Sequence, residues 1–111
     1  MIEQIVLTYL STALSVPVFA EIPTAPGKSF VVIEKTGSGN SNHISSAMIA
    51  VQSYADTLLG AAQLNEAVKE AMENLTDLDS IGRCKLNTDY NFTDTASKRY
   101  RYQAVFDITH Y

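Results

Sequence analysis

The segment 33–46, IEKTGSGNSNHISS, is the first part of the sequence whose residue types could support chemistry, because it combines two glycines, several hydroxyl side chains and His43. A P-loop needs a lysine directly after its last glycine, a dinucleotide fingerprint needs three spaced glycines that enter a helix, and a nucleophile elbow needs Gly-x-Ser-x-Gly. None of these spacings occurs here. The segment is therefore predicted to form a hairpin loop at 37–42, whose glycines permit positive φ. A small hydrolase or ligand-binding domain that uses Ser41 and His43 stays open as an alternative.

The other candidates for catalysis or metal binding are isolated or exposed. His43 and His110 are the only histidines, and neither has a second His or Cys at the spacing of a metal site. Two carboxylate clusters, at 66–73 and 77–79, fall on the outer face of a predicted helix and at its exit, where the burial that acid–base catalysis requires is rare. The sequence therefore predicts no catalytic residues, no metal and no cofactor.

Size and composition predict one acidic domain that spans residues 1–111. The 111 residues suffice for a single core. A charged fraction of only 18% indicates that part of the surface meets another protein. The net charge of −4 lacks the basic footprint of an autonomous nucleic-acid-binding protein. Cys84 is the only cysteine, so the chain forms no internal disulfide, which fits a reducing compartment.

The apolar stretch 1–20 has a small residue, Ala20, where a signal peptide could be cleaved. It carries Glu3 and no lysine or arginine, which argues against export. The apolar run is also too short to span a bilayer, so no membrane partner is expected. A secreted adaptor remains a weaker alternative, which cleavage after Ala20 would support.

Two helices are predicted from apolar residues that recur at helical spacing. The first covers 2–14, and the second extends for about 20 residues from a plausible N-cap at Asp56. Between them, Pro17 and Pro23 bound a short extended segment of the kind found at a sheet edge.

Strands are predicted at 30–36 and 47–54, and strict alternation predicts two more at 83–92 and 99–109, joined by the turn 93–98. The predicted fold is α+β, with a four-stranded, mostly antiparallel sheet and both helices packed on one face. A right-handed crossover through the long helix would add a parallel pairing and make the sheet mixed.

The strands FVVI and AMIA, at 30–33 and 47–50, are apolar on both faces, unlike the alternating C-terminal strands. A strand buried on both sides needs a layer on both sides, and two helices cover only one. We therefore expect a neighbouring subunit to cover part of the other face. Alternatively, these are central strands with ordinary exposed alanines and valines.

Four cations alternate with apolar residues in the last two strands: Arg83, Lys85, Arg99 and Arg101. If these strands pair, the four side chains share the polar face of one hairpin. They could then meet acidic groups of a neighbour or DNA that passes nearby, or they could simply be solvated.

Three stretches carry a resemblance to a known family: FAEIPTAPGKSFVVIEKTGSG, AMIAVQSYADTLLGAAQLNEAVKEAM and CKLNTDYNFTDTASKRYRYQAVFDI. In this order they resemble the tail-completion, or tail-terminator, proteins of long-tailed phages and prophages. The resemblance covers nearly the whole chain and rests on overall pattern, since no catalytic signature defines that family.

The resemblance implies a small structural subunit, not an enzyme, that closes into a homo-oligomeric ring, usually a hexamer. The ring caps the tail tube protein, offers a face to the head connector or stopper protein, and lets DNA pass through its centre. Such a protein belongs to the tail or neck of the virion and to the host cytoplasm during assembly. A head-side connector or stopper ring is the related alternative.

The loops 35–45 and 91–99 are the expected contacts to neighbouring rings, because flexible loops often order on docking. Together with the doubly apolar strands and the cations, they make up the expected assembly interface: Val31, Ile33, Lys35, Ser38, Asn40, His43, Ile49, Val51, Arg83, Lys85, Thr95, Lys98, Arg99 and Arg101.

Overall fold

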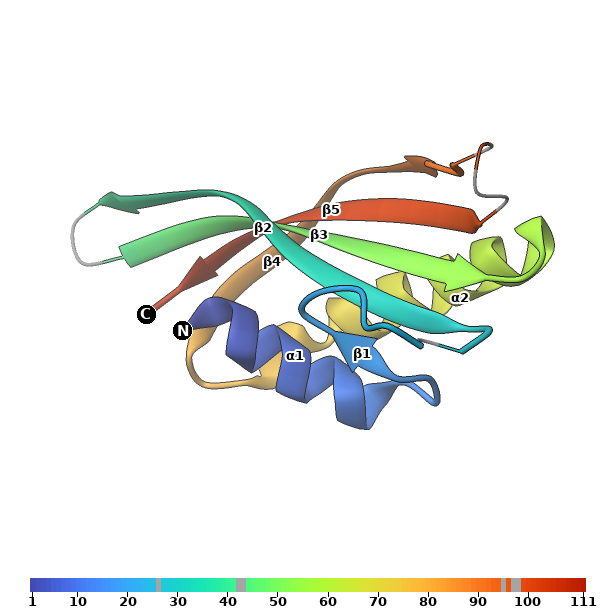
Figure 1. Ribbon diagram of the computed structural model, residues 1–111. Helices are drawn as coiled ribbons and strands as arrows, with labels where there is room; N and C mark the ends of the chain where they lie inside the picture. Colours follow the sequence, from blue (N-terminus) through green and yellow to red (C-terminus); the bar gives the residue numbers. More distant parts are fainter. Residues whose placement is uncertain (26, 42–43, 95, 97–98) are drawn as a thin grey trace.

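A computed structural model of the chain describes residues 1–25, 27–41, 44–94, 96 and 99–111. Along these residues it has two α-helices, five strands and one 3₁₀ turn (Figure 1). Their bounds are α1 Ile2–Ala13, β1 Val18–Phe19, β2 Phe30–Ser41, β3 Ile44–Ala55, α2 Leu58–Glu73, the 3₁₀ turn Leu75–Asp77, β4 Ile81–Asn91 and β5 Tyr100–His110. Of the helices in these ranges, none is long and apolar enough to cross a membrane.

The strands form one mixed sheet in the order β1-β2-β3-β5-β4. The expected count of four strands is wrong, because the segment between Pro17 and Pro23 adds β1 at the edge. There β1 runs parallel to β2, with Val18 beside Val31, and the amide of Val31 donates to the carbonyl of Pro17 at 2.9 Å. All other pairings are antiparallel. The crossover through α2 makes no parallel pair, since β5 lies between β3 and β4.

Both helices pack on the same face of the sheet, as expected (Figure 1). The Tyr9 hydroxyl on α1 donates to the carbonyl of Ala71 on α2 at 2.6 Å and ties the helices together. The core between helices and sheet consists of buried apolar residues from all of these elements: Ile2, Val6, Leu10, Val31, Ile33, Ala47, Ile49, Val51, Val68, Met72, Leu75, Ile81, Ala104, Phe106 and Ile108.

The second helix is shorter than expected and begins one residue later. Thr57, not Asp56, is its N-cap, and the Thr57 side chain accepts a hydrogen bond from the amide of Gly60 at 3.0 Å. The helix ends at Glu73 after 16 residues, where the 3₁₀ turn takes over.

The expected loop at 37–42 is largely strand. Pairing between β2 and β3 continues from Gly37 opposite Met48 to Ser41 opposite Ile44, past a bulge between Lys35 and Gly37. Backbone pairing to β3 overrides the low strand propensity of these polar residues. On its other edge β3 pairs with β5 as far as Ser45, which supports this part of the hairpin.

A bulge in β4 changes which way its side chains face. Leu86 pairs with Phe106 and Thr88 pairs with Val105, so Asn87 is an extra residue. One inserted residue moves every later side chain to the opposite face. The single buried face expected for 84, 86, 88, 90 and 92 is therefore wrong: the first two face the helices, and Thr88 and Tyr90 face the other way.

Ile49 and Met48 are adjacent in β3 but face opposite sides of the sheet, so we expect their substitution by alanine to affect stability differently. We expect Ile49→Ala to lower the free energy of unfolding by about 2–5 kcal/mol, because Ile49 is fully buried and its loss leaves a cavity. Met48→Ala is the matched control: Met48 is 37% exposed on the other face, so its effect should stay near about 0.5 kcal/mol. Urea denaturation followed by circular dichroism measures both, and equal losses would contradict this assignment of the faces.

Candidate assembly surface

The face of the sheet turned away from both helices, here called the open face, is apolar at its centre. Val32 and Ala50 are 5% and 1% exposed, and both point to this face because their neighbours Ile33 and Val51 lie in the helix-side core. The rings of Phe30 and Tyr54 stack with centroids 4.5 Å apart. The prediction that these strands are buried on both faces holds for Phe30, Val32 and Ala50 but not for Met48, which is 37% exposed. Side chains of the same chain provide this shielding, so the expected cover by a neighbouring subunit is not required at the centre of the open face.

A row of hydrogen bonds, here called the polar ladder, crosses the open face from β4 to β3. Gln103 donates to the Tyr90 hydroxyl, and Gln52 Nε2 donates to Gln103 Oε1 at 2.8 Å. The Tyr54 hydroxyl donates to Gln52 Oε1 at 3.3 Å, and Arg101 Nη1 donates to the Tyr54 hydroxyl at 3.0 Å. Because Gln52 and Gln103 are less than a tenth exposed, these bonds offset the cost of burying their amides.

Two arginines cover the aromatic end of the open face. The Arg101 guanidinium lies 4.2 Å from the ring centroid of Phe92 and 5.5 Å from that of Tyr54, and its Nε donates to the carbonyl of Phe92 at 2.8 Å. The Arg99 guanidinium lies 5.8 Å from the ring of Phe30. Cation–π contact and stacking of this kind shield apolar rings from water while the charge stays solvated.

The four cations of the C-terminal strands share the open face but form two separate pairs. Arg83 and Lys85 sit opposite Thr109 and Asp107, at one end of the β4–β5 hairpin. Arg101 lies six residues from Asp107 along β5, about 20 Å away at strand spacing. The two pairs therefore cannot act as one continuous basic stripe.

Four residues of the expected interface are core residues instead. Val31, Ile33, Ile49 and Val51 are at most 2% exposed and pack beneath the helices, so no partner can reach them while the chain is folded. Their assignment to an interface is corrected here. Alternation within each strand turns one set of apolar side chains to the helices, and the sequence does not say which set.

Of the remaining expected residues, Arg101 is partly buried, and the others are exposed or lie outside the described residues. Lys35, Ser38 and Asn40 are exposed on the outer part of β2, and Arg83, Lys85 and Arg99 are also exposed. Three of the expected residues, His43, Thr95 and Lys98, lie outside the described residues.

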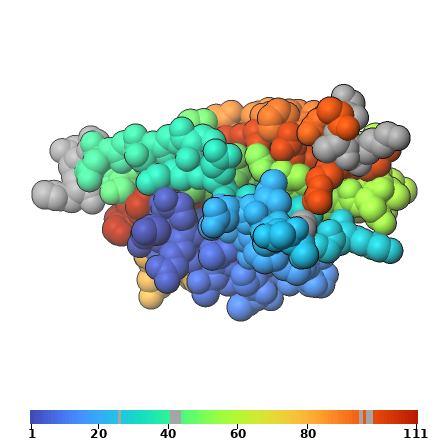
Figure 2. All heavy atoms as spheres, viewed as in Figure 1, coloured from blue at the N-terminus to red at the C-terminus, as the bar shows by residue number. Residues whose placement is uncertain are grey.

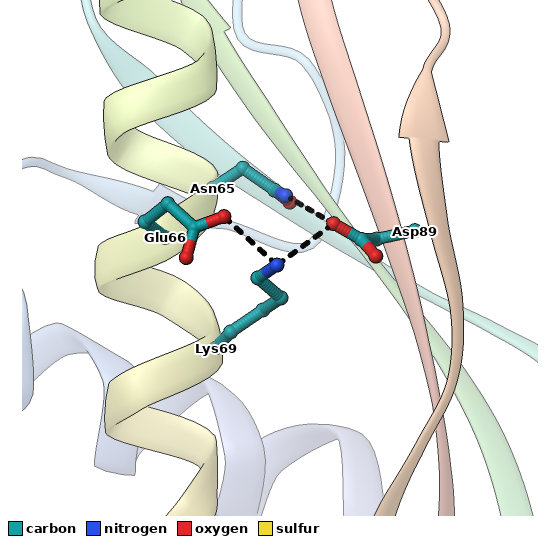
Figure 3. A network of polar contacts seen from close by, with 4 residues as sticks. All are labelled: Asn65, Glu66, Lys69 and Asp89. Atoms are coloured by element: carbon teal, nitrogen blue, oxygen red, sulfur yellow. Dashed lines mark hydrogen bonds and ion pairs between the residues drawn. The ribbon is translucent and has the colours of Figure 1, made fainter.

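A polar cluster lies between α2 and β4, and the contacts that Asp89 makes across these two elements have no signal in the sequence (Figure 3). Asp89 Oδ2 accepts hydrogen bonds from Asn65 Nδ2 at 2.9 Å and from Lys69 Nζ at 3.0 Å. Lys69 Nζ also lies 2.8 Å from Glu66 Oε1, and hydrogen bonds to Glu66 and then Asp89 raise the pKa of Lys69. Strict alternation places Asp89 on the polar face of its hairpin; the bulge turns it to the helix, where it anchors β4.

Three of the exposed large apolar side chains lie on β4 or directly after it: Leu86 on the helix side, and Tyr90 and Phe92 on the open face, are 39%, 40% and 41% exposed. Others lie elsewhere, among them Leu59 on α2 at 68% and Tyr111 at 72%. Beside β4 a groove of about 460 Å³ runs along α2. Its floor is apolar and its rim is acidic, with the lining residues Glu66, Lys69, Glu70, Met72, Glu73, Cys84, Leu86 and Phe106. The outer margin of β4 thus combines apolar surface with charge, as protein contact surfaces do.

Asp89 is predicted to hold the edge strand to the helix. We expect Asp89→Ala to lower the free energy of unfolding by about 1–3 kcal/mol, because it leaves the Asn65 amide, on a side chain 1% exposed, without its acceptor. Glu73→Ala, an exposed change on the same helix, is the control and should be close to neutral. If both variants unfold at the same urea concentration, the cluster does not anchor β4.

Cys84 is predicted to react slowly in the folded protein. Burial raises the pKa of its thiol from 9.0 to about 11, so the thiolate fraction at pH 8 falls roughly 100-fold. Because folding favours the protonated thiol, this contribution to stability is present below pH 9 and is lost as the pH rises through about 11. Reaction with a thiol reagent at pH 8, with and without urea, measures the effect; equal rates would show that the thiol is not shielded.

Within the described ranges, no three His, Cys, Asp or Glu side chains come together as a metal site. Neither a family model nor a curated protein matches this chain. Its function therefore has to be inferred from the open face, the edges of the sheet and the distribution of charge.

Proposed function

We propose that this protein is a non-enzymatic virion component of a long-tailed phage or prophage that forms a ring on the tail tube and joins it to the head connector. The observation that carries the proposal is the covering of the sheet by helices on one face only, together with a free edge strand, β4, on which Leu86 and Tyr90 are 39% and 40% exposed. The resemblance of nearly the whole sequence to tail-terminator proteins supports the same function.

The proposed mechanism is contact between two different surfaces of neighbouring copies, repeated until a ring closes. Head-to-tail contacts of this kind generate rings, and closure removes sheet edges that would otherwise aggregate. The ring would end polymerisation of the tube on one side and receive the connector on the other, while DNA passes through its centre. The acidic net charge of −4 suits a lumen that DNA traverses without binding tightly.

Exposed cations give the proposed assembly an ionic component. Arg83, Lys85 and Arg99 are exposed, and the screening length falls to about 8 Å at 0.15 M salt. Docking through these side chains should therefore weaken as salt is added.

The test is binding to purified tail tubes, with portal complexes as the comparison. We expect the protein to label one end of each tube in negative-stain images, to form rings by light scattering and imaging at high concentration, and to dissociate more readily in high salt. Binding to portals and not to tubes would favour the stopper ring instead. A protein that binds neither and stays monomeric at all concentrations would overturn the proposal.

A further inference from the structure

The sheet has two free edges on opposite sides of the molecule. Of the described strands, β5 alone pairs with β4, so the outer backbone groups of β4 face away from the sheet. On the other side β1 pairs with β2 only at Val31 and Val32, which leaves β2 free from Glu34 to Ser41. In Figure 2 this outer part of β2 lies along the upper front of the molecule, above α1, with no other segment in front of it.

The strand directions allow these two edges to meet. From β2 through β3 and β5 to β4, each strand is antiparallel to the last, so β2 and β4 run in opposite directions. A second copy in the same orientation therefore presents β2 antiparallel to β4 of the first. The combined sheet keeps its helices on one side, and the step can be repeated around a ring.

Charge favours this pairing on the open face of the sheet. On the open face the β4 margin carries Arg83 and Lys85, and the β2 margin carries Glu34. On the helix side the contrast is weaker: the groove beside β4 carries Glu66, Glu70 and Glu73 but also Lys69, which is paired with Glu66. The β2 margin there has Lys35, whose ammonium lies 3.6 Å from Glu3. Opposite charges on adjacent strands stabilise pairing.

The same charges disfavour the simplest competing dimer. If β4 of two copies paired antiparallel about a two-fold axis, both α2 helices would flank the junction on one side. Their carboxylate rows would then face each other, and Arg83 and Lys85 would face their own copies on the open side. Like charges on adjacent strands are destabilising.

The bulges leave matching segments uninterrupted on the two edges. On β2 the stretch after the bulge is 37–41, and on β4 the stretch between its two bulges is 83–86. Following the ladder across the sheet, Arg83 lies level with Gly39 through Thr109 and Ser46. Cys84 lies level with Ser38 through Ile108 and Ala47. Two copies at the same height would therefore join where the bulge-free stretches overlap, with 83–85 opposite 37–39.

We propose that β4 of one copy pairs antiparallel with the outer part of β2 of the next copy, with 83–85 opposite 37–39, and that this pairing closes the ring. The inference rests on the proposed ring, and it specifies the surface that each copy contributes.

Disulfide trapping tests this register. In Ser38→Cys the new thiol should meet the native Cys84 of the neighbouring copy, whereas within one chain the two positions are three strand spacings, about 14 Å, apart. Cys84 ionises slowly, so a disulfide through it could form slowly. A second variant therefore places both thiols on the open face: Gly37→Cys with Lys85→Cys in a Cys84→Ser background. At Gly37 a Cβ meets nothing closer than 3.8 Å. Each variant is oxidised at high concentration and run on a non-reducing gel.

We expect a ladder of cross-linked species that extends to the full ring, at least tenfold more abundant than in two controls. One control is Ser38→Cys with Cys84→Ser, and the other is Gln63→Cys with Lys85→Cys in the Cys84→Ser background; Gln63 is exposed on α2, away from both edges. Rings by light scattering without a ladder in either variant would overturn this pairing but leave the proposed function standing. Dimers without longer species would show two-fold pairing and overturn it too. Monomers that bind neither tubes nor each other would overturn both proposals.

Discussion

Neither α1 nor α2 covers the open face, so its own side chains have to shield the centre of the sheet from water. The pairing of the central strands depends on this shielding. The central strands β2 and β3 are apolar on both sides, while α1 and α2 cover one. On the other side, the stacked rings of Phe30 and Tyr54 and the amides of Gln52 and Gln103 lie against one another. Both amide oxygens accept hydrogen bonds, so the two amides are satisfied although each side chain is less than a tenth exposed. The hydrogen bonds of this buried ladder form only when their partner residues lie side by side, so the ladder also fixes the register of β3, β5 and β4.

The bulge in β4 lets the residues before it and the residues after it contact different parts of the molecule. Before it, Leu86 contributes to the groove beside α2; after it, Tyr90 reaches the end of the polar ladder and Asp89 reaches Asn65 and Lys69 (Figure 3). Without the extra residue, Asp89 would join the open face and the buried Asn65 amide would lose its partner. One residue therefore links the anchoring of the helix to the completion of the ladder.

The spacing of apolar residues along the chain was enough to predict the features that depend only on neighbouring residues. Both helices, the four long strands and the faces of β5 follow from spacing alone, as does the burial of Val32 and Ala50 on the open face, although Met48 beside them is 37% exposed. The bulge in β4 could not be predicted, because it depends on pairing with β5 and the letters around Asn87 continue the alternation. Asp56 and Thr57 are both good caps, and only the geometry selects the second. The Asn65–Asp89 contact joins residues 24 apart, a separation with no periodic signal.

The free edges show how bulges can serve protection and recognition together. A long, flat edge strand invites pairing with any chain, and bulges are one device that prevents it. Here each free edge is interrupted, between Lys35 and Gly37 and between Leu86 and Thr88, so that only a few residues on each remain regular. Those short stretches lie at the same height where 83–85 meet 37–39, and on the open face the charges beside them have opposite signs. Such an edge resists pairing with unrelated chains, because an unrelated strand would have to match both the register and the charges. A second copy in the proposed ring meets both conditions.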